Sequence, residues 1–161
     1  MQQRITPNLW FDTEAEEAAA FYVSVFPRSR VVHVAHYTDA GPRPAGMVMA
    51  VEFELDGQRF VAINGGPQFA FDEAISLQVN CDTQEEIDYY WERLSDGGEE
   101  GPCGWLKDRY GLSWQVTPAG MEELLAGADT DRAERAMRAV LGMGKIDIEA
   151  LNRAADGVPA G

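Results

Sequence analysis

Two stretches of alternating apolar and polar residues are each followed by a segment with helical spacing. The first stretch covers 6–12 and leads into DTEAEEAAAFY, and the second covers 74–82 and leads into DTQEEIDYYW. Alternation predicts a strand with one buried face, whereas apolar residues three and four positions apart predict an amphipathic helix. The same strand-to-helix layout therefore occurs twice, which indicates an internal repeat of architecture.

A predicted capping box opens each of these helices. Thr13 is followed three positions later by Glu16, and Thr83 is followed in the same way by Glu86. In such a box the threonine oxygen accepts a hydrogen bond from an unpaired backbone N–H, and the glutamate reaches back to the cap residue. We therefore expect both helices to begin at these threonines.

Alternating or valine-rich stretches after each helix predict further strands. They are 30–38, 47–55 and 58–64 in the first half, and 99–107 and 112–117 in the second. The stretch 99–107 supplies one long strand or two short ones, and Asp56-Gly57 is a hairpin signal. Each half thus reads strand-helix-strand-strand-strand.

The whole pattern predicts an α+β chain of two βαβββ modules, which form a curled mixed sheet, and a C-terminal helical extension. The first module covers 1–67, the second 68–119 and the extension 120–161. Within the extension, apolar residues recur at helical spacing from Ala133 to Leu141. Such a stripe has to be covered by the chain's own sheet or by a second chain, and both alternatives stay open.

Charge narrows the classes of partner. The chain has 161 residues and a formal net charge of −14, so it repels phosphate backbones and anionic headgroups, and we expect no nucleic acid or membrane partner. No apolar run has the length of a membrane span, and the N-terminus lacks the apolar core of a secretion signal. We therefore expect a cytoplasmic protein, in which Cys81 and Cys103 are reduced thiols.

Four motifs carry a resemblance to a known family. They are ITPNLWFD, AINGGPQF, SLQVNCDTQEEIDYYWERL and CGWLKDRYGLSWQVTP. They resemble the PhnB-like subgroup of the vicinal oxygen chelate superfamily, which includes glyoxalase I, extradiol dioxygenases and bleomycin-resistance proteins. Members of this subgroup are often labelled 3-demethylubiquinone-9 3-methyltransferase. The resemblance implies that each module curls into a cup with its helix outside, that the concave side holds the ligand, and that the chain forms a homodimer.

Strand alternation predicts which side chains line that cup. On each strand the more apolar set is expected to face the helix, and the other set is expected to face the ligand. The predicted ligand-binding residues are Asn8, Trp10, Phe60, Asn64, Ser76, Gln78, Ser113 and Gln115. Such a lining of amides, hydroxyls and a few aromatic rings suits a small, largely neutral, partly aromatic molecule.

The lining is a poor match for the metal site that the resemblance implies. Active members of the superfamily hold a divalent metal with His, Gln or Glu from the first and last strands of each module. Here Gln115 stands at the position that resembles the final metal carboxylate, and these strands carry no histidine. His33 and His36, three apart on one predicted strand, are expected on opposite faces. Neutral oxygens bind transition metals weakly, so we predict no tightly held metal and no other cofactor.

Two classes of function remain open. The first is a binding module that sequesters or carries a small molecule in a metal-free cup. The second is an enzyme of the superfamily, either a methyltransferase as the subgroup is labelled or a lyase or isomerase that recruits a weakly held metal. Gly65-Gly66 is followed by Pro67 and no helical pattern, so the chain lacks the glycine-rich loop typical of Rossmann-like methyl donor sites. The sequence identifies no catalytic residue.

Overall fold

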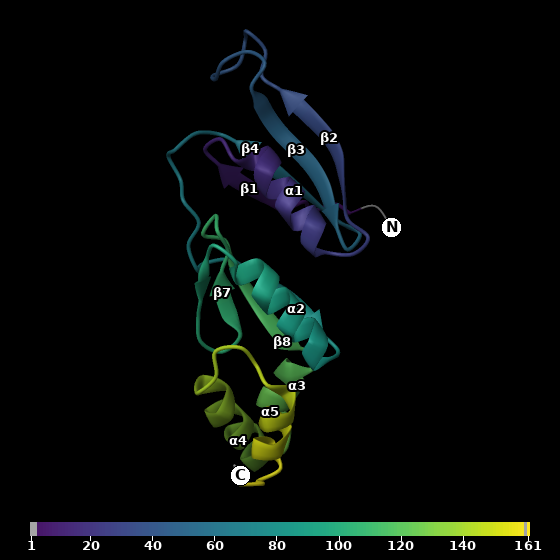
Figure 1. Ribbon diagram of the computed structural model, residues 1–161, viewed down its shortest axis with the longest axis vertical. Coiled ribbons are helices and arrows are strands. Elements are labelled where there is room, and N and C mark those ends of the chain that lie inside the picture. The colour runs from purple at the N-terminus through teal and green to yellow at the C-terminus, as the bar shows by residue number, and fades with distance from the viewer. Residues whose placement is uncertain (1–2, 160) are drawn as a thin grey trace. The chain divides into compact units, whose positions relative to one another are not determined.

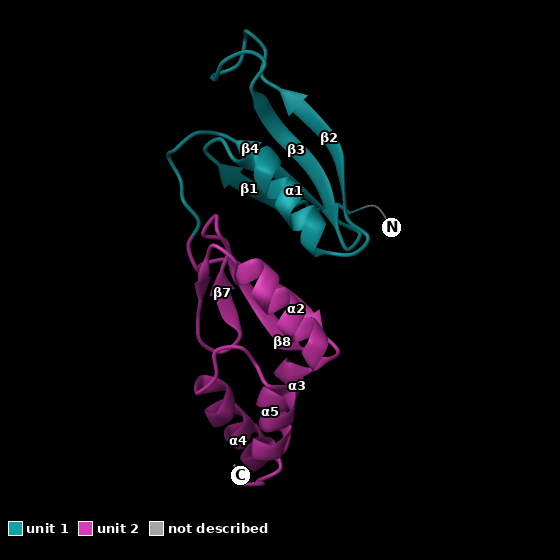
Figure 2. Ribbon diagram, in the orientation of Figure 1, with its two compact units in different colours: residues 1–71 teal, residues 72–161 magenta. Residues whose placement is uncertain are grey.

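The computed structural model describes residues 3–159 and 161, and it divides the chain into two compact units, 1–71 and 72–161 (Figures 1 and 2). The first unit contains β1 (Asn8–Phe11), α1 (Ala15–Val25), β2 (Arg30–His36), β3 (Val48–Leu55) and β4 (Gln58–Asn64). The second contains β5 (Ser76–Cys81), α2 (Gln84–Ser95), β6 (Glu99–Glu100), β7 (Trp105–Lys107), β8 (Ser113–Pro118), α3 (Met121–Ala126), α4 (Thr130–Leu141) and α5 (Ile148–Ala155). The predicted boundaries after residues 67 and 119 remain predictions.

Each unit contains one open, four-stranded mixed sheet of the same topology. The strand orders are β1-β4-β3-β2 and β5-β8-β7-β6, so the first and last strands of each module lie side by side. That pair is parallel in both sheets, and the other neighbours are antiparallel. The predicted α+β fold of two βαβββ modules with C-terminal helices is confirmed. None of the described helices is both long and apolar enough to cross a membrane.

The core of the first unit lies between α1 and one face of its sheet. Tyr22 of α1 stacks on Phe53 of β3, and Phe53 stacks on Phe60 of β4, with ring centroids 6.3 Å and 5.6 Å apart. Phe60 is therefore on the helix-covered face, and its predicted place in the cup is wrong. Residues 60–63 are all apolar, so alternation could not identify the buried face of this strand.

The two helix starts differ, although their sequences are alike. At α2 the backbone N–H of Glu86 donates to the Thr83 hydroxyl, 3.2 Å away, and the Glu86 carboxylate accepts from the N–H of Asp82. The second capping box is confirmed, with the glutamate reaching one residue beyond the cap. The first box is wrong: α1 begins one residue later, and its first N–H, that of Ala15, donates to the side chain of Asn64 instead.

The hairpin between β3 and β4 forms as predicted. Asp56 and Gly57 have φ angles of 48° and 82°, the left-handed conformation that a two-residue hairpin loop needs at both central positions. This turn fixes the antiparallel register of the two strands, from Leu55 opposite Gln58 to Ala50 opposite Ile63.

The C-terminal helices pack within the second unit. Ala136 and Val140 of α4 are buried in the contact with α5, whereas Leu141 is 64% exposed. The loop after α4 is also bound to the rest of this unit, because the N–H groups of Cys103 and Gly104 donate to the carbonyls of Met143 and Gly144 at 2.8 Å. The apolar stripe of the extension is thus mostly covered by its own unit, and only its outer edge remains exposed.

Candidate functional site

The parallel pair β5–β8 gathers polar side chains on the face of the second sheet that is turned away from α2. Its register places Ser76 opposite Ser113, Gln78 opposite Gln115, and Asn80 opposite Thr117. Residues directly opposite on neighbouring strands point to the same side, and the alternate residues Trp114 and Val116 are buried on the other side. We call this polar surface the open face of the second sheet.

Hydrogen bonds cross the open face from strand to strand. The Gln115 amide donates to the Ser76 hydroxyl at 2.9 Å, and the Gln78 amide donates to the Thr117 hydroxyl at 3.2 Å and to the Asn80 side-chain oxygen at 2.9 Å. These bonds hold the amide planes in fixed orientations. Amide and hydroxyl groups fixed in this way present donors and acceptors in a defined pattern, as a selective binding surface requires.

Strand β7 adds a ring and a charge to the same face. Trp105 lies opposite Gln115 in the ladder, and Lys107 lies opposite Ser113. The Lys107 ammonium is 2.5 Å from the carboxylate of Glu73. Their hydrogen bond holds the pKa of Glu73 below its ordinary value and the pKa of Lys107 above its own. The site therefore contains an aromatic ring and an ion pair beside the amides, and both come from outside the four strands that the sequence pattern assigned to the cup.

A cavity of about 230 Å³ opens at this end of the face. Its lining consists of Glu73, Glu99, Glu100, Gly101, Pro102, Trp105, Leu106, Lys107 and Ser113. Ser113 is only 1% exposed, and its hydroxyl is the one buried side-chain polar atom in the described part of the chain that makes no hydrogen bond. A buried hydroxyl without a partner costs stability, so it calls for an explanation such as a ligand or a water that pairs with it.

The turn before β8 is built by Asp108, whose role the sequence did not reveal. Its carboxylate is 2% exposed and accepts hydrogen bonds from the N–H groups of Tyr110 and Leu112 and from the indole of Trp114, at 2.9–3.1 Å. The turn and the first residues of β8 are thereby fixed. Asp108 thus positions Ser113 without lying on the open face.

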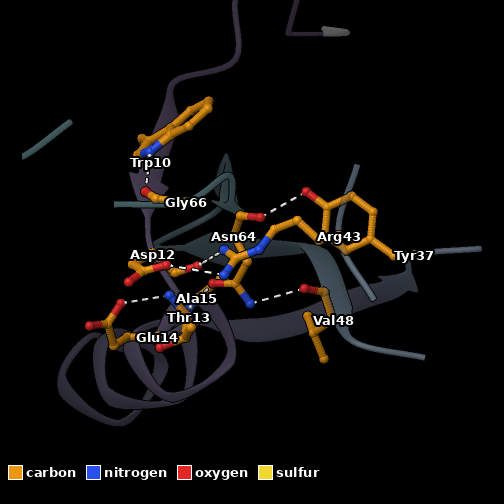
Figure 3. Close-up of polar contacts among 10 residues, drawn as sticks. All are labelled: Trp10, Asp12, Thr13, Glu14, Ala15, Tyr37, Arg43, Val48, Asn64 and Gly66. Atoms are coloured by element: carbon orange, nitrogen blue, oxygen red, sulfur yellow. Dashed lines mark hydrogen bonds and ion pairs between the residues drawn. The ribbon is translucent and has the colours of Figure 1, made fainter. Parts of the chain in front are cut away.

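In the first unit, Trp10 lies on the sheet face away from α1 and is half-buried. Its indole N–H donates to the carbonyl of Gly66 at 2.9 Å (Figure 3). The ring packs over Gly65, where a Cβ atom would lie 2.2 Å from it, and Phe69 meets it edge-on with centroids 5.1 Å apart. The Gly-Gly-Pro turn therefore serves to receive this indole. Asn8 is exposed on the same face.

Asn64 was predicted to face the ligand, and the structure places it on the helix-covered face instead. It is 2% exposed, and its side-chain oxygen accepts from the N–H of Ala15 at 2.9 Å while its amide donates to the carbonyl of Val48 at 3.0 Å. Its own carbonyl accepts from the Tyr37 hydroxyl at 2.8 Å (Figure 3). The predicted orientation of Asn64 is wrong, because this residue joins β4 to the start of α1 and to β3.

The eight predicted residues therefore fall into three groups. Ser76, Gln78, Ser113 and Gln115 meet on the open face of the second sheet. Asn8 and Trp10 share a face of the first sheet, in the other unit. Phe60 and Asn64 are core residues of the first unit.

The donor set does not fit the metal that the resemblance implies. Among residues 3–159 and 161, no group of three or more His, Cys, Asp or Glu side chains is arranged to hold an ion. Of the neutral positions that match the superfamily's ligands, Asn64 is turned into the core, and the amide of Gln115 donates to Ser76. His33 and His36 are both exposed on β2. The other matching positions offer only neutral oxygens, which are weak ligands for a transition metal.

A second cavity, of about 510 Å³, lies where the ends of β5 and β8 meet the C-terminal helices. Its walls include Cys81, Asp82, Arg132 and Asn152. Burial, reinforced by the carboxylates of Glu86 and Asp82, raises the pKa of the Cys81 thiol to about 12. Cys81 is therefore a protonated, unreactive thiol at neutral pH.

Comparison with known proteins agrees with this architecture. Two βαβββ modules of the same sheet topology define a glyoxalase-like fold. The model of the 3-demethylubiquinone-9 3-methyltransferase family matches residues 3–117, and the chain belongs to this PhnB-like family. None of the curated proteins compared with the chain matches it.

Several solved structures share this fold. A PhnB protein from Bacillus cereus, provisionally named a 3-demethylubiquinone-9 3-methyltransferase, is 40% identical, with a TM-score of 0.65 over 73% of this chain and 100% of its own. A Pseudomonas aeruginosa protein is 20% identical, with a TM-score of 0.60 over 73% of this chain and 98% of its own. The fosfomycin resistance protein FosX from Listeria monocytogenes is 15% identical, with a TM-score of 0.53 over 76% of this chain and 98% of its own. The last two likenesses show the fold alone.

Proposed function

We propose that this PhnB-like protein binds a small, partly aromatic molecule on the open face of the second sheet, without a tightly held metal. The observation that carries the proposal is the buried, unpaired hydroxyl of Ser113 in a cavity wall beside the ring of Trp105. A ligand group that pairs with this hydroxyl removes a cost that the free protein bears.

The fixed amides beyond the cavity extend the proposed site. Gln115 and Ser76 are joined by a hydrogen bond and keep further donor and acceptor capacity toward solvent. Trp105, directly opposite Gln115, supplies an aromatic surface for ring stacking. The site as a whole therefore favours a ligand with one planar ring and one amide-like or hydroxyl group.

A titration with benzamide, followed by backbone amide NMR shifts, tests this proposal. We expect saturable shifts at Ser76, Trp105, Ser113 and Gln115. The variant Gln115→Ala should weaken binding about tenfold, because it removes a hydrogen-bonding group from the site. The matched control is Gln58→Ala, an exposed glutamine of the first unit, which should leave binding unchanged. Absence of saturable shifts at the open face would refute the proposal.

The family description favours a second function, methyl transfer. Transfer to a hydroxyl or phenol requires a bound methyl donor, and the open face has no glycine-rich loop of the usual kind. Calorimetry with S-adenosylmethionine separates the alternatives. Saturable binding of this donor, with competition by benzamide, would favour the transferase over a simple binding module.

We also propose that the chain forms a homodimer. The outer edge of α4 supports this, because Met137 and Leu141 are 40% and 64% exposed although both continue the buried stripe of that helix. A second copy packed on this edge of α4 would remove these apolar side chains from water.

A further inference from the structure

The charges around the Ser113 cavity are unbalanced. Three carboxylates line it, those of Glu73, Glu99 and Glu100, together with a single ammonium, that of Lys107. Lys107 is paired with Glu73, and the Glu100 carboxylate accepts from the indole of Trp91. The cavity therefore has a negative potential, which a cation would relieve.

Glu99 is the carboxylate best placed to meet a ligand. It lies opposite Lys107 in the β6–β7 ladder, so its side chain is on the open face. It forms no ion pair within 4.0 Å in the described part of the chain, and it is exposed. The ring of Trp105, two positions before Lys107 on the same strand, points to the same side. A carboxylate next to an indole is a recurring arrangement for organic cations, because the ring face attracts positive charge as well.

We infer that the Ser113 cavity binds the protonated amine end of an aromatic or alkyl amine, a cationic group seated between Glu99, the Trp105 ring and the Ser113 hydroxyl. This inference rests on the proposed function, because it names the ligand chemistry of the same site. The hydroxyl accepts an N–H of the ammonium through the lone pairs that the protein leaves unused.

The cavity volume indicates that only one end of the ligand enters. At about 230 Å³ it is smaller than the 300–1,000 Å³ common for whole ligands. The ring and the neutral part of the ligand would lie along Gln115 and Ser76 outside it. The polar strands alone indicated a largely neutral ligand, because the carboxylates belong to the short strand β6 and to the segment before β5.

Benzylamine and benzyl alcohol test the inference, since they are matched in size and differ in charge. Titration of the intact chain by NMR should show benzylamine binding about tenfold more tightly, and this preference should shrink at high salt. Glu99→Gln should reduce the preference to about twofold, because it removes the carboxylate and keeps the shape. The matched control, Glu92→Gln, changes an exposed carboxylate of α2, outside the cavity, and should keep the full preference.

Each outcome decides between the two proposals. Equal binding of both probes at the open face would overturn the cation inference and leave the proposed function standing. A preference that falls equally in Glu99→Gln and Glu92→Gln would reflect the general charge of the chain and would also overturn it. Binding of neither probe, together with no benzamide shifts, would refute both.

Discussion

The side-chain oxygen of Asn64 accepts the first free backbone N–H of α1, that of Ala15, across 49 positions of sequence. This long-range cap replaces the local capping box, and it joins the last strand of the first module to the start of its helix. The amide of the same side chain donates to the Val48 carbonyl, so both of its polar atoms are used. Asn64 is therefore a structural residue of the first unit.

Replacing Asn64 should lower stability strongly. In Asn64→Ala the N–H of Ala15 and the carbonyl of Val48 both lose their partner inside the protein, and we expect the free energy of unfolding to fall by about 3 kcal/mol. Asn8→Ala is the matched control, because Asn8 is exposed on the parallel neighbour β1, and it should change stability by less than about 0.5 kcal/mol. Urea unfolding followed by circular dichroism measures both. A loss for Asn64→Ala no larger than for Asn8→Ala would contradict the capping role.

Ser113 should show the opposite behaviour. Its buried hydroxyl makes no hydrogen bond, so Ser113→Ala should leave the protein equally stable or stabilise it by up to about 1 kcal/mol while it weakens ligand binding. Thr117, four residues along the same strand, accepts from Gln78, and Thr117→Val should destabilise the protein by about 1 kcal/mol. Thermal unfolding of the two variants provides the comparison. A clear loss of stability in Ser113→Ala would show that the hydroxyl has a structural partner after all.

Local signals predicted the helices, strands and turns, whereas packing between distant residues decided which face of each strand is buried. The hairpin turn at Asp56-Gly57 and the helix cap at Thr83 depend only on residues a few positions away, so both could be predicted. The orientation of Phe60 could not, because every residue from 60 to 63 is apolar and the packing of β4 against α1 decides which face is buried. Strand alternation predicted that Ser76 and Ser113 both face away from the helix, but it could not predict the parallel pairing that places them opposite each other. The missing partner of the Ser113 hydroxyl likewise depends on how neighbouring side chains enclose it.

Alkaline pH should destabilise the native protein through Cys81. Its pKa is raised from an ordinary 9.0 to about 12 by burial, so the unfolded state releases this proton first. Stability that is fully present below pH 9 should therefore be lost progressively as pH rises from 9 toward 12, with about 1 kcal/mol gone by about pH 10. Unfolding under reducing conditions should show this decline in the native chain and a shallower decline in Cys81→Ala. Equal slopes in the two proteins would contradict the buried, protonated thiol.

Removing the C-terminal helices should disturb the second unit. Truncation after Ala119 takes away Ile146, which is fully buried, and the carbonyl partners of Cys103 and Gly104. We expect insoluble or monomeric protein. The variant Leu141→Ser keeps the packing of the C-terminal helices against the rest of the second unit, so the chain should stay folded. Its dimer should weaken, which light scattering after size exclusion would measure. A truncated chain that stays a soluble dimer would exclude a dimer interface on these helices.

The metal-free character of the open face can be measured directly, by titrating benzamide into protein treated with a chelator and into the same protein supplied with one equivalent of Mn²⁺ or Zn²⁺. The account predicts equal affinity in both samples, with the shifted amides at Ser76, Ser113 and Gln115. Saturable binding that occurs only after the metal is restored, with one ion retained per chain, would contradict it.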